Sequence, residues 1–121
     1  MVVILMLNQL SRKTYLNLHN AMFTQIKTSK RNREVVTELS RKFNLGAENM
    51  IARIALVYSL SLGRHLSISD IEDSQGKEYS KNVLFGSNLP YYVGLICVHY
   101  NIYKTDKDIP KYIKMHIDDG L

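Results

Sequence analysis

Several residue types are scarce in this chain of 121 residues, and each scarcity excludes a class of protein. The single cysteine, Cys97, can neither close an intramolecular disulfide nor supply a cysteine cage for zinc or an iron–sulfur cluster. No segment contains the roughly 20 consecutive apolar residues that a membrane-spanning helix needs. The apolar opening lacks the basic start and the cleavage site of a secretory signal. We therefore expect a cytoplasmic protein with no membrane partner.

Acidic residues are scarce in the first half of the chain. Residues 1–65 contain ten Lys or Arg and three Glu, whereas residues 66–121 contain six Lys and eight Asp or Glu. The formal charge is therefore +7 in the first part and −2 in the second, and +5 in total. This asymmetry favours a surface that faces a polyanion, and the alternative is a solvated basic face without a partner.

The length and the hydrophobic fraction of 45% predict one globular domain. We expect this domain at residues 23–121, with residues 1–22 as an N-terminal extension, because Met6 or Met22 could each be the start. The predicted fold is mainly α, a compact helical domain. Its N-terminal half is expected to be a strand and two helices, as in ribbon-helix-helix proteins, and two further helices form the C-terminal half.

The spacing of apolar residues predicts the first elements. Residues 23–28 favour a short strand, and residues 29–44 favour a helix with one buried stripe. Gly46 is suited to the left-handed conformation that ends such a helix. The stripe comprises Val35, Val36, Leu39 and Phe43.

The second helix, residues 47–62, is apolar around most of its circumference and carries one basic residue, Arg53. A helix of this kind is buried on more than one side. Because the domain is small, we expect a sister subunit to provide part of the cover. We also expect Arg53 to form a structural ion pair, with Glu48 or with an acidic loop residue.

The C-terminal half begins with a polar, turn-rich segment, residues 64–88, which we expect to be an ordered loop with an extended piece at residues 83–85. Pro90 and Pro110 are suited to the first turns of two helices, and Gly120 stands where a C-cap glycine would stand. The predicted inner faces of these helices are Val93, Ile96, Cys97 and Tyr100 in the first, and Tyr112, Ile113, His116 and Ile117 in the second.

Residues capable of catalysis form no recognisable pattern. Cys97 lies on an apolar helix face, where a thiol usually packs without reacting. The histidines lack the i, i+4 spacing of a helical zinc pair, so we predict no metal site, no cofactor and no catalytic residue. These histidines are His19, His65, His99 and His116.

Two alternatives to a binding protein stay open. The acidic pairs Asp70–Asp73 and Asp118–Asp119 could hold Mg²⁺ in a weak nicking nuclease, or a tyrosine could attack the phosphate, although solvated-loop and helix-end roles fit these acids better. A ribbon-helix-helix transcription regulator is the second alternative, because the paired strands of such proteins enter the major groove.

The basic segment "KTSKRNR", residues 27–33, is the strongest candidate site. A helix N-terminus attracts phosphate through its free N–H groups, and here Lys and Arg side chains add positive charge. Thr28 and Ser29 add hydroxyl donors suited to phosphate oxygens. Such contacts would bind the DNA backbone and carry little sequence information. A solvated helix start is the structural alternative.

The stretches "NMIARIAL" (residues 49–56), "GKEYSKNVLFG" (residues 76–86) and the ending "YIKMHIDDGL" resemble the DNA sulfur modification protein DndE family. The resemblance covers residues 23–121, while residues 1–22 depart from the family pattern. It implies a small helical protein that forms a homo-oligomer, a tetramer, and binds double-stranded DNA with a preference for nicked duplex.

The resemblance also implies a role for this chain within a larger system. Other DNA sulfur modification proteins, including a cysteine desulfurase and ATP-handling partners, would replace a non-bridging phosphate oxygen with sulfur. This chain would be the accessory subunit that handles DNA, and not an enzyme. The residues onto which the basic surface of the family carries over are Lys27, Lys30, Arg31, Arg33, Arg41, Lys42 and Arg64.

Overall fold

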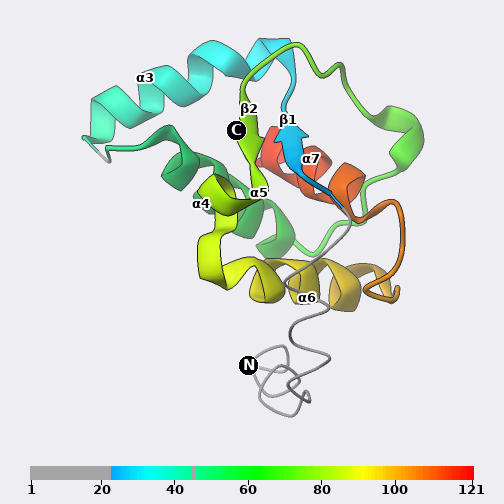
Figure 1. Ribbon diagram of the computed structural model, residues 1–121. Helices are drawn as coiled ribbons and strands as arrows, with labels where there is room; N and C mark the ends of the chain where they lie inside the picture. The colour runs from blue at the N-terminus through cyan, green and yellow to red at the C-terminus, as the bar shows by residue number, and fades with distance from the viewer. Residues whose placement is uncertain (1–22, 45) are drawn as a thin grey trace.

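The computed structural model describes residues 23–44 and 46–121 (Figure 1), so the proposed extension and His19 lie outside the described residues. The predicted mainly α fold is confirmed. Short 3-10 turns (η) and two strands connect the helices. In chain order the elements are β1 (Gln25–Lys27), η1 (Lys30–Asn32), α3 (Arg33–Phe43), α4 (Glu48–Ser61), η2 (Ile68–Asp70), β2 (Glu78–Ser80), α5 (Lys81–Phe85), η3 (Gly86–Asn88), α6 (Leu89–Tyr100) and α7 (Ile109–Gly120).

The C-terminal helix α7 is the most enclosed element and packs against α4, α6 and β1 (Figure 1). All residues from 113 to 118 are buried. Ile113 and Ile117 belong to one hydrophobic core with Leu56 of α4 and Val93 of α6. The inner stripe predicted for this helix is therefore confirmed, and α7 positions the other elements around it.

Helix α4 is buried on one side only. Ala52, Ala55 and Leu56 face the core, whereas the opposite side is open. The described residues of a single chain therefore leave the second side of this helix uncovered, as we expect from the sequence of so small a domain. The cover by a sister subunit stays a prediction. The exposed apolar residues of this region are Met50, Ile54, Val57, Tyr58 and Leu62.

Two predicted caps differ from the structure. The first helix ends at Asn44, which takes the left-handed conformation with φ 52°, and Gly46 follows with φ 78°. Gly120 is not a cap, because it lies within α7, where a Cβ atom would come 2.0 Å from the carbonyl oxygen of Ala55. Its role is to let α7 approach the backbone of α4.

The segment between α4 and α6 contains more structure than expected. The predicted extended piece at residues 83–85 is wrong, because these residues belong to the short helix α5. Ser80 caps this helix by accepting a hydrogen bond from the backbone N–H of Val83 at 3.2 Å, and Leu84 and Phe85 turn into the core. A side-chain cap and the burial of two adjacent apolar residues outweigh the weak strand preference of so short a run.

Strand β1 pairs with β2 of the same chain in antiparallel register, with Ile26 opposite Tyr79. In a ribbon-helix-helix protein the equivalent strand pairs with its copy in a second chain and enters the major groove. The internal pairing argues against that class of regulator. Among the described residues, no helix combines the length and the apolar character that crossing a bilayer requires.

Candidate nucleic-acid interface

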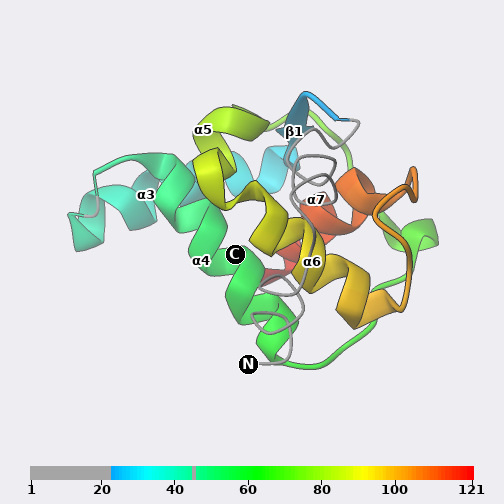
Figure 2. The ribbon, with the colours of Figure 1, turned by 60° about the horizontal axis from the view of Figure 1, so that its bottom comes forward.

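Helix α3 extends away from the body of the protein in both views (Figures 1 and 2) and carries three of the seven predicted cations, Arg33, Arg41 and Lys42. Five of the seven are exposed and form no ion pair with any described residue. Lys27 stands slightly apart, because it lies opposite Glu78 in the β1–β2 register. We call these five residues the α3 basic surface: Lys27, Lys30, Arg33, Arg41 and Lys42.

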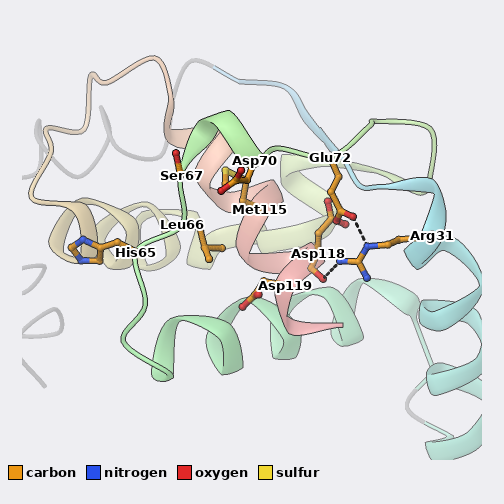
Figure 3. A pocket seen from close by; sticks show the side chains of 9 residues that line it. All are labelled: Arg31, His65, Leu66, Ser67, Asp70, Glu72, Met115, Asp118 and Asp119. Atoms are coloured by element: carbon orange, nitrogen blue, oxygen red, sulfur yellow. Dashed lines mark hydrogen bonds and ion pairs between the residues drawn. The ribbon is translucent and has the colours of Figure 1, made fainter.

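The other two predicted cations are already paired with carboxylates. Arg31 forms an ion pair with Glu72, and this hydrogen bond raises the pKa of the guanidinium further (Figure 3). Arg64 lies 2.7 Å from a carboxylate oxygen of Asp119. A phosphate would have to displace these carboxylates, so Arg31 and Arg64 are less available than the α3 basic surface.

The helix entrance predicted to bind phosphate is occupied by the protein's own carboxylates. The backbone N–H of Ser29 donates to Asp118 at 3.0 Å, and that of Lys30 donates to Asp73 at 2.9 Å. The latter contact holds the pKa of Asp73 below its usual value. Thr28 and Ser29 are fully buried, so their hydroxyl groups cannot reach DNA. These two N–H groups and two hydroxyls are therefore not available to phosphate, which leaves the basic side chains as the main candidates for contact in this region.

Asp118 anchors this region to α7. Its buried carboxylate accepts hydrogen bonds from the side-chain amide of Asn32 at 2.9 Å and from the ammonium group of Lys114 at 2.7 Å, in addition to Ser29. The sequence suggested a helix-end role for this acid, and the structure places it in the last turn of α7, buried at a junction. The junction holds the start of α3 in place, so the helix can project.

A pocket of about 410 Å³ lies between η2 and the end of α7 (Figure 3). Four carboxylates and one guanidinium line it, so the pocket disfavours phosphate. Arg31, which lines this acidic pocket, is therefore less suited to bind phosphate than the cations of the α3 basic surface. Its lining is Arg31, His65, Leu66, Ser67, Asp70, Glu72, Met115, Asp118 and Asp119.

A second, shallower hollow of about 450 Å³ lies along α3. Arg33, Thr37 and Arg41 occupy successive turns of the helix beside it, and Lys77 reaches it from the loop before β2. Glu34 and Glu38 also line this hollow, so three cations face two carboxylates. Sequence reasoning missed Lys77, because only the fold brings it next to α3.

The expected ion pair of Arg53 is absent among the described residues. Glu48, its predicted partner, instead lies 3.0 Å from the ammonium group of Lys77. Arg53 lines an apolar hollow on α4 together with Ile54 and Tyr58.

The fold also joins residues that no sequence pattern connected. His116 is fully buried, with its Nδ1 2.8 Å from the hydroxyl of Ser59 and its Nε2 2.6 Å from that of Tyr100. Ser59 in turn donates to Asp119 at 2.7 Å. Tyr100 also accepts the backbone N–H of Leu66 at 3.0 Å, so its oxygen is held on two sides. This hydrogen-bonded network links α4, α6 and α7, and we interpret it as a structural network that holds these helices together in the core.

The described residues offer no evident reaction centre. Burial raises the pKa of the Cys97 thiol to about 11, which keeps it protonated and unreactive near neutral pH. Within residues 23–44 and 46–121, no group of three or more His, Cys, Asp or Glu could hold a metal ion.

The comparisons with known proteins bear on family and fold. The family model for "DNA sulphur modification protein DndE" matches residues 25–121. The crystal structure of DndE from Escherichia coli B7A, described as involved in DNA phosphorothioation modification, is similar with a TM-score of 0.64 and 18% sequence identity. The match covers 81% of this chain and 93% of that chain. No curated protein matches the sequence. The family model spans most of the chain, and the chain therefore belongs to the DNA sulphur modification protein DndE family.

Proposed function

We propose that this protein is the DNA-binding accessory subunit of a DNA sulfur modification system and that it contacts the DNA backbone through the α3 basic surface. One observation carries the proposal: five exposed cations that form no ion pair with any described residue gather on and beside a helix that projects from the fold. By contrast, Arg31 and Arg64 are neutralised by the carboxylates of Glu72 and Asp119.

Backbone contact fits the chemistry of this surface better than base recognition. Lys and Arg side chains bind phosphate oxygens, which are alike at every sequence. The side chains of Arg33 and Arg41 are eight residues apart on α3, which corresponds to about 12 Å along the helix axis. That separation is comparable to a few successive phosphates of one strand, so both guanidinium groups can bind the same duplex.

The proposal includes a preference for nicked duplex, and the placement of cations around α3 supports it. Arg41 and Lys42 point about 100° apart around the helix, so a straight duplex on one side cannot meet both equally. A nick interrupts one backbone and lowers the cost of bending, which lets the DNA bend toward both side chains. We therefore propose that nicked double-stranded DNA is the favoured ligand.

The proposal includes partners. The exposed apolar side of α4 supports self-association, since large exposed apolar patches mark interaction sites. We propose a homo-oligomer, a tetramer, that acts in the cytoplasm beside the other DNA sulfur modification proteins. These partners carry out the sulfur chemistry, and the present chain is not itself an enzyme.

Fluorescence anisotropy with labelled intact and nicked duplexes of one sequence tests the proposal. If about five phosphates are neutralised, the logarithm of the affinity falls with that of the salt concentration at a slope of about −4.5. Nicked duplex should bind more tightly than intact duplex, and changing the base sequence should have little effect. A flat salt response contradicts the proposed backbone contact.

A matched pair of variants tests the surface. Arg41→Glu with Lys42→Glu reverses two charges on α3, and Lys104→Glu with Lys107→Glu reverses two in the loop before α7. The first variant should lose at least tenfold in affinity, whereas the second should lose little beyond the effect of net charge. Equal losses in both variants would show that α3 is not the binding surface. Metal-dependent nicking of supercoiled plasmid, or a footprint at one promoter, would instead favour the nuclease or the regulator.

A further inference from the structure

Arg31 is held in a fixed position by buried groups of the protein (Figure 3). Its Nη1 donates to the side-chain oxygen of Asn32 at 3.1 Å, and its Nη2 donates to the backbone carbonyl of Asp118 at 3.3 Å. Both acceptors belong to buried residues, and the side-chain amide of Asn32 is itself bonded to Asp118. These two bonds orient the guanidinium without the help of any further partner.

Glu72 covers the remaining nitrogen of this guanidinium. Its carboxylate accepts a hydrogen bond from Nε of Arg31, and the contact lies at the surface, where the side chains of Arg31 and Glu72 are 56% and 36% exposed. An exposed ion pair of this kind contributes little to stability, so another anion can replace the carboxylate. Arg31 is therefore an oriented guanidinium whose Nε–H is occupied by a replaceable acid.

The loop between η2 and β2 keeps Glu72 at this place. The next residue, Asp73, accepts a hydrogen bond from the backbone N–H of Lys30 at 2.9 Å. Gly76 lies so close to the start of α3 that a Cβ atom on it would come 2.1 Å from the carbonyl oxygen of Ser29. The loop is therefore tied to the segment that precedes α3, and it places an acid beside the α3 basic surface.

Two members of the α3 basic surface, Lys30 and Arg33, flank Arg31 in the chain. DNA that lies on these two side chains brings phosphates close to the guanidinium between them. At this position the carboxylate of Glu72 repels the phosphates, and it also competes with them for the Nε–H of Arg31.

We propose that Glu72 restrains DNA binding by occupying Arg31, and that Arg31 becomes an additional phosphate contact when Glu72 is displaced. This inference rests on the proposed backbone contact of the α3 basic surface and adds its regulation. The restraint weakens the binding of any duplex that does not reach Arg31. It therefore favours DNA whose backbone extends from α3 to the loop that carries Glu72.

A double-mutant cycle, measured by fluorescence anisotropy on one nicked duplex, tests the proposal. Glu72→Gln should tighten binding about three- to fivefold and steepen the salt slope by about 0.9, because Arg31 is set free for one more phosphate. Arg31→Gln should have a small effect in the wild type, but it should remove most of the gain in the Glu72→Gln background. The control Asp106→Asn removes the same charge from the loop before α7 and should change the affinity by less than about twofold.

Two outcomes overturn the inference alone. If the gain from Glu72→Gln persists when Arg31 is also replaced, the acid acts only through net charge and does not compete for Arg31. If the salt slope of Glu72→Gln equals that of the wild type, no additional phosphate contact forms. The second measurement needs no change at Arg31, so it stays decisive even if circular dichroism shows that Arg31→Gln is unfolded.

Other outcomes separate the inference from the proposed function. A gain that depends on Arg31, while Arg41→Glu with Lys42→Glu leaves binding unchanged, contradicts the proposed α3 surface and supports the restraint. If neither the wild type nor Glu72→Gln binds DNA at low salt, the proposed function and the inference are both wrong.

Discussion

Lowering the pH from 7 to 5 should destabilise the folded chain through His116. This side chain is fully buried among Ser59 of α4, Tyr100 of α6 and the loop that follows α4. Burial is the main cause that lowers the pKa of His116 to about 4, from 6.5 in an exposed chain. Nearby His99, Arg64 and His65 lower this pKa further, and the Asp119 carboxylate opposes them.

The sign and size of the effect follow from proton binding. Between pH 6.5 and pH 4 the unfolded chain binds a proton at this histidine and the folded chain does not, so the unfolded state gains stability as the pH falls. The loss of unfolding free energy is about 2 kcal/mol between pH 7 and pH 5, and about 3 kcal/mol once both states are protonated.

Urea denaturation at pH 7, 6 and 5 measures this loss directly. The matched variant is His116→Gln, which keeps a polar side chain of similar length but does not titrate in this range. Carboxylates elsewhere contribute equally to both proteins, so the wild type should lose about 2 kcal/mol more than the variant between pH 7 and pH 5. The same pH dependence in both proteins would refute the reasoning that His116 is held neutral by burial.

Two further predictions concern the packing of α7. Gly120→Ala should cost about 1–3 kcal/mol of unfolding free energy, measured by urea denaturation, because the new methyl group would overlap the carbonyl oxygen of Ala55; an unchanged midpoint would show that the helices can separate freely. Asp118→Ala should cost about 3–5 kcal/mol, because it leaves the buried ammonium group of Lys114 without its partner. The double variant Asp118→Ala with Lys114→Met should recover part of that loss, and no recovery would contradict the assigned ion pair.

The helices and their inner faces were predictable because they depend on neighbours within a few residues. Val93 and Ile96 of α6, and Ile113 and Ile117 of α7, recur at helical spacing and are buried as expected. The same rule failed for Phe43, which continues the stripe of α3 but is 58% exposed. The periodicity identifies a face of the helix, but it does not say how far the rest of the protein extends beneath it.

The candidate site was predictable only in part. The excess of basic residues in the first half of the chain is visible in the sequence, and so are the residues that the family resemblance indicates. Whether each cation is free to bind phosphate is not visible in the sequence. The carboxylates that pair with Arg31 and Arg64 lie 41 and 55 residues further along the chain. The N–H of Ser29 is taken by an acid 89 residues away.

The sequence by itself determined the helical class, the family and the concentration of positive charge near α3, since each of these depends on composition, local spacing or matched residues. The tertiary structure decided which cations stay free, which face of α4 stays open and that Gly120 serves a close helix contact. Electrostatic pairing and packing act between atoms a few ångströms apart, whatever their distance in sequence. Only the fold sets those distances, and for that reason the α3 basic surface and the pairing of Arg31 with Glu72 emerged from the structure.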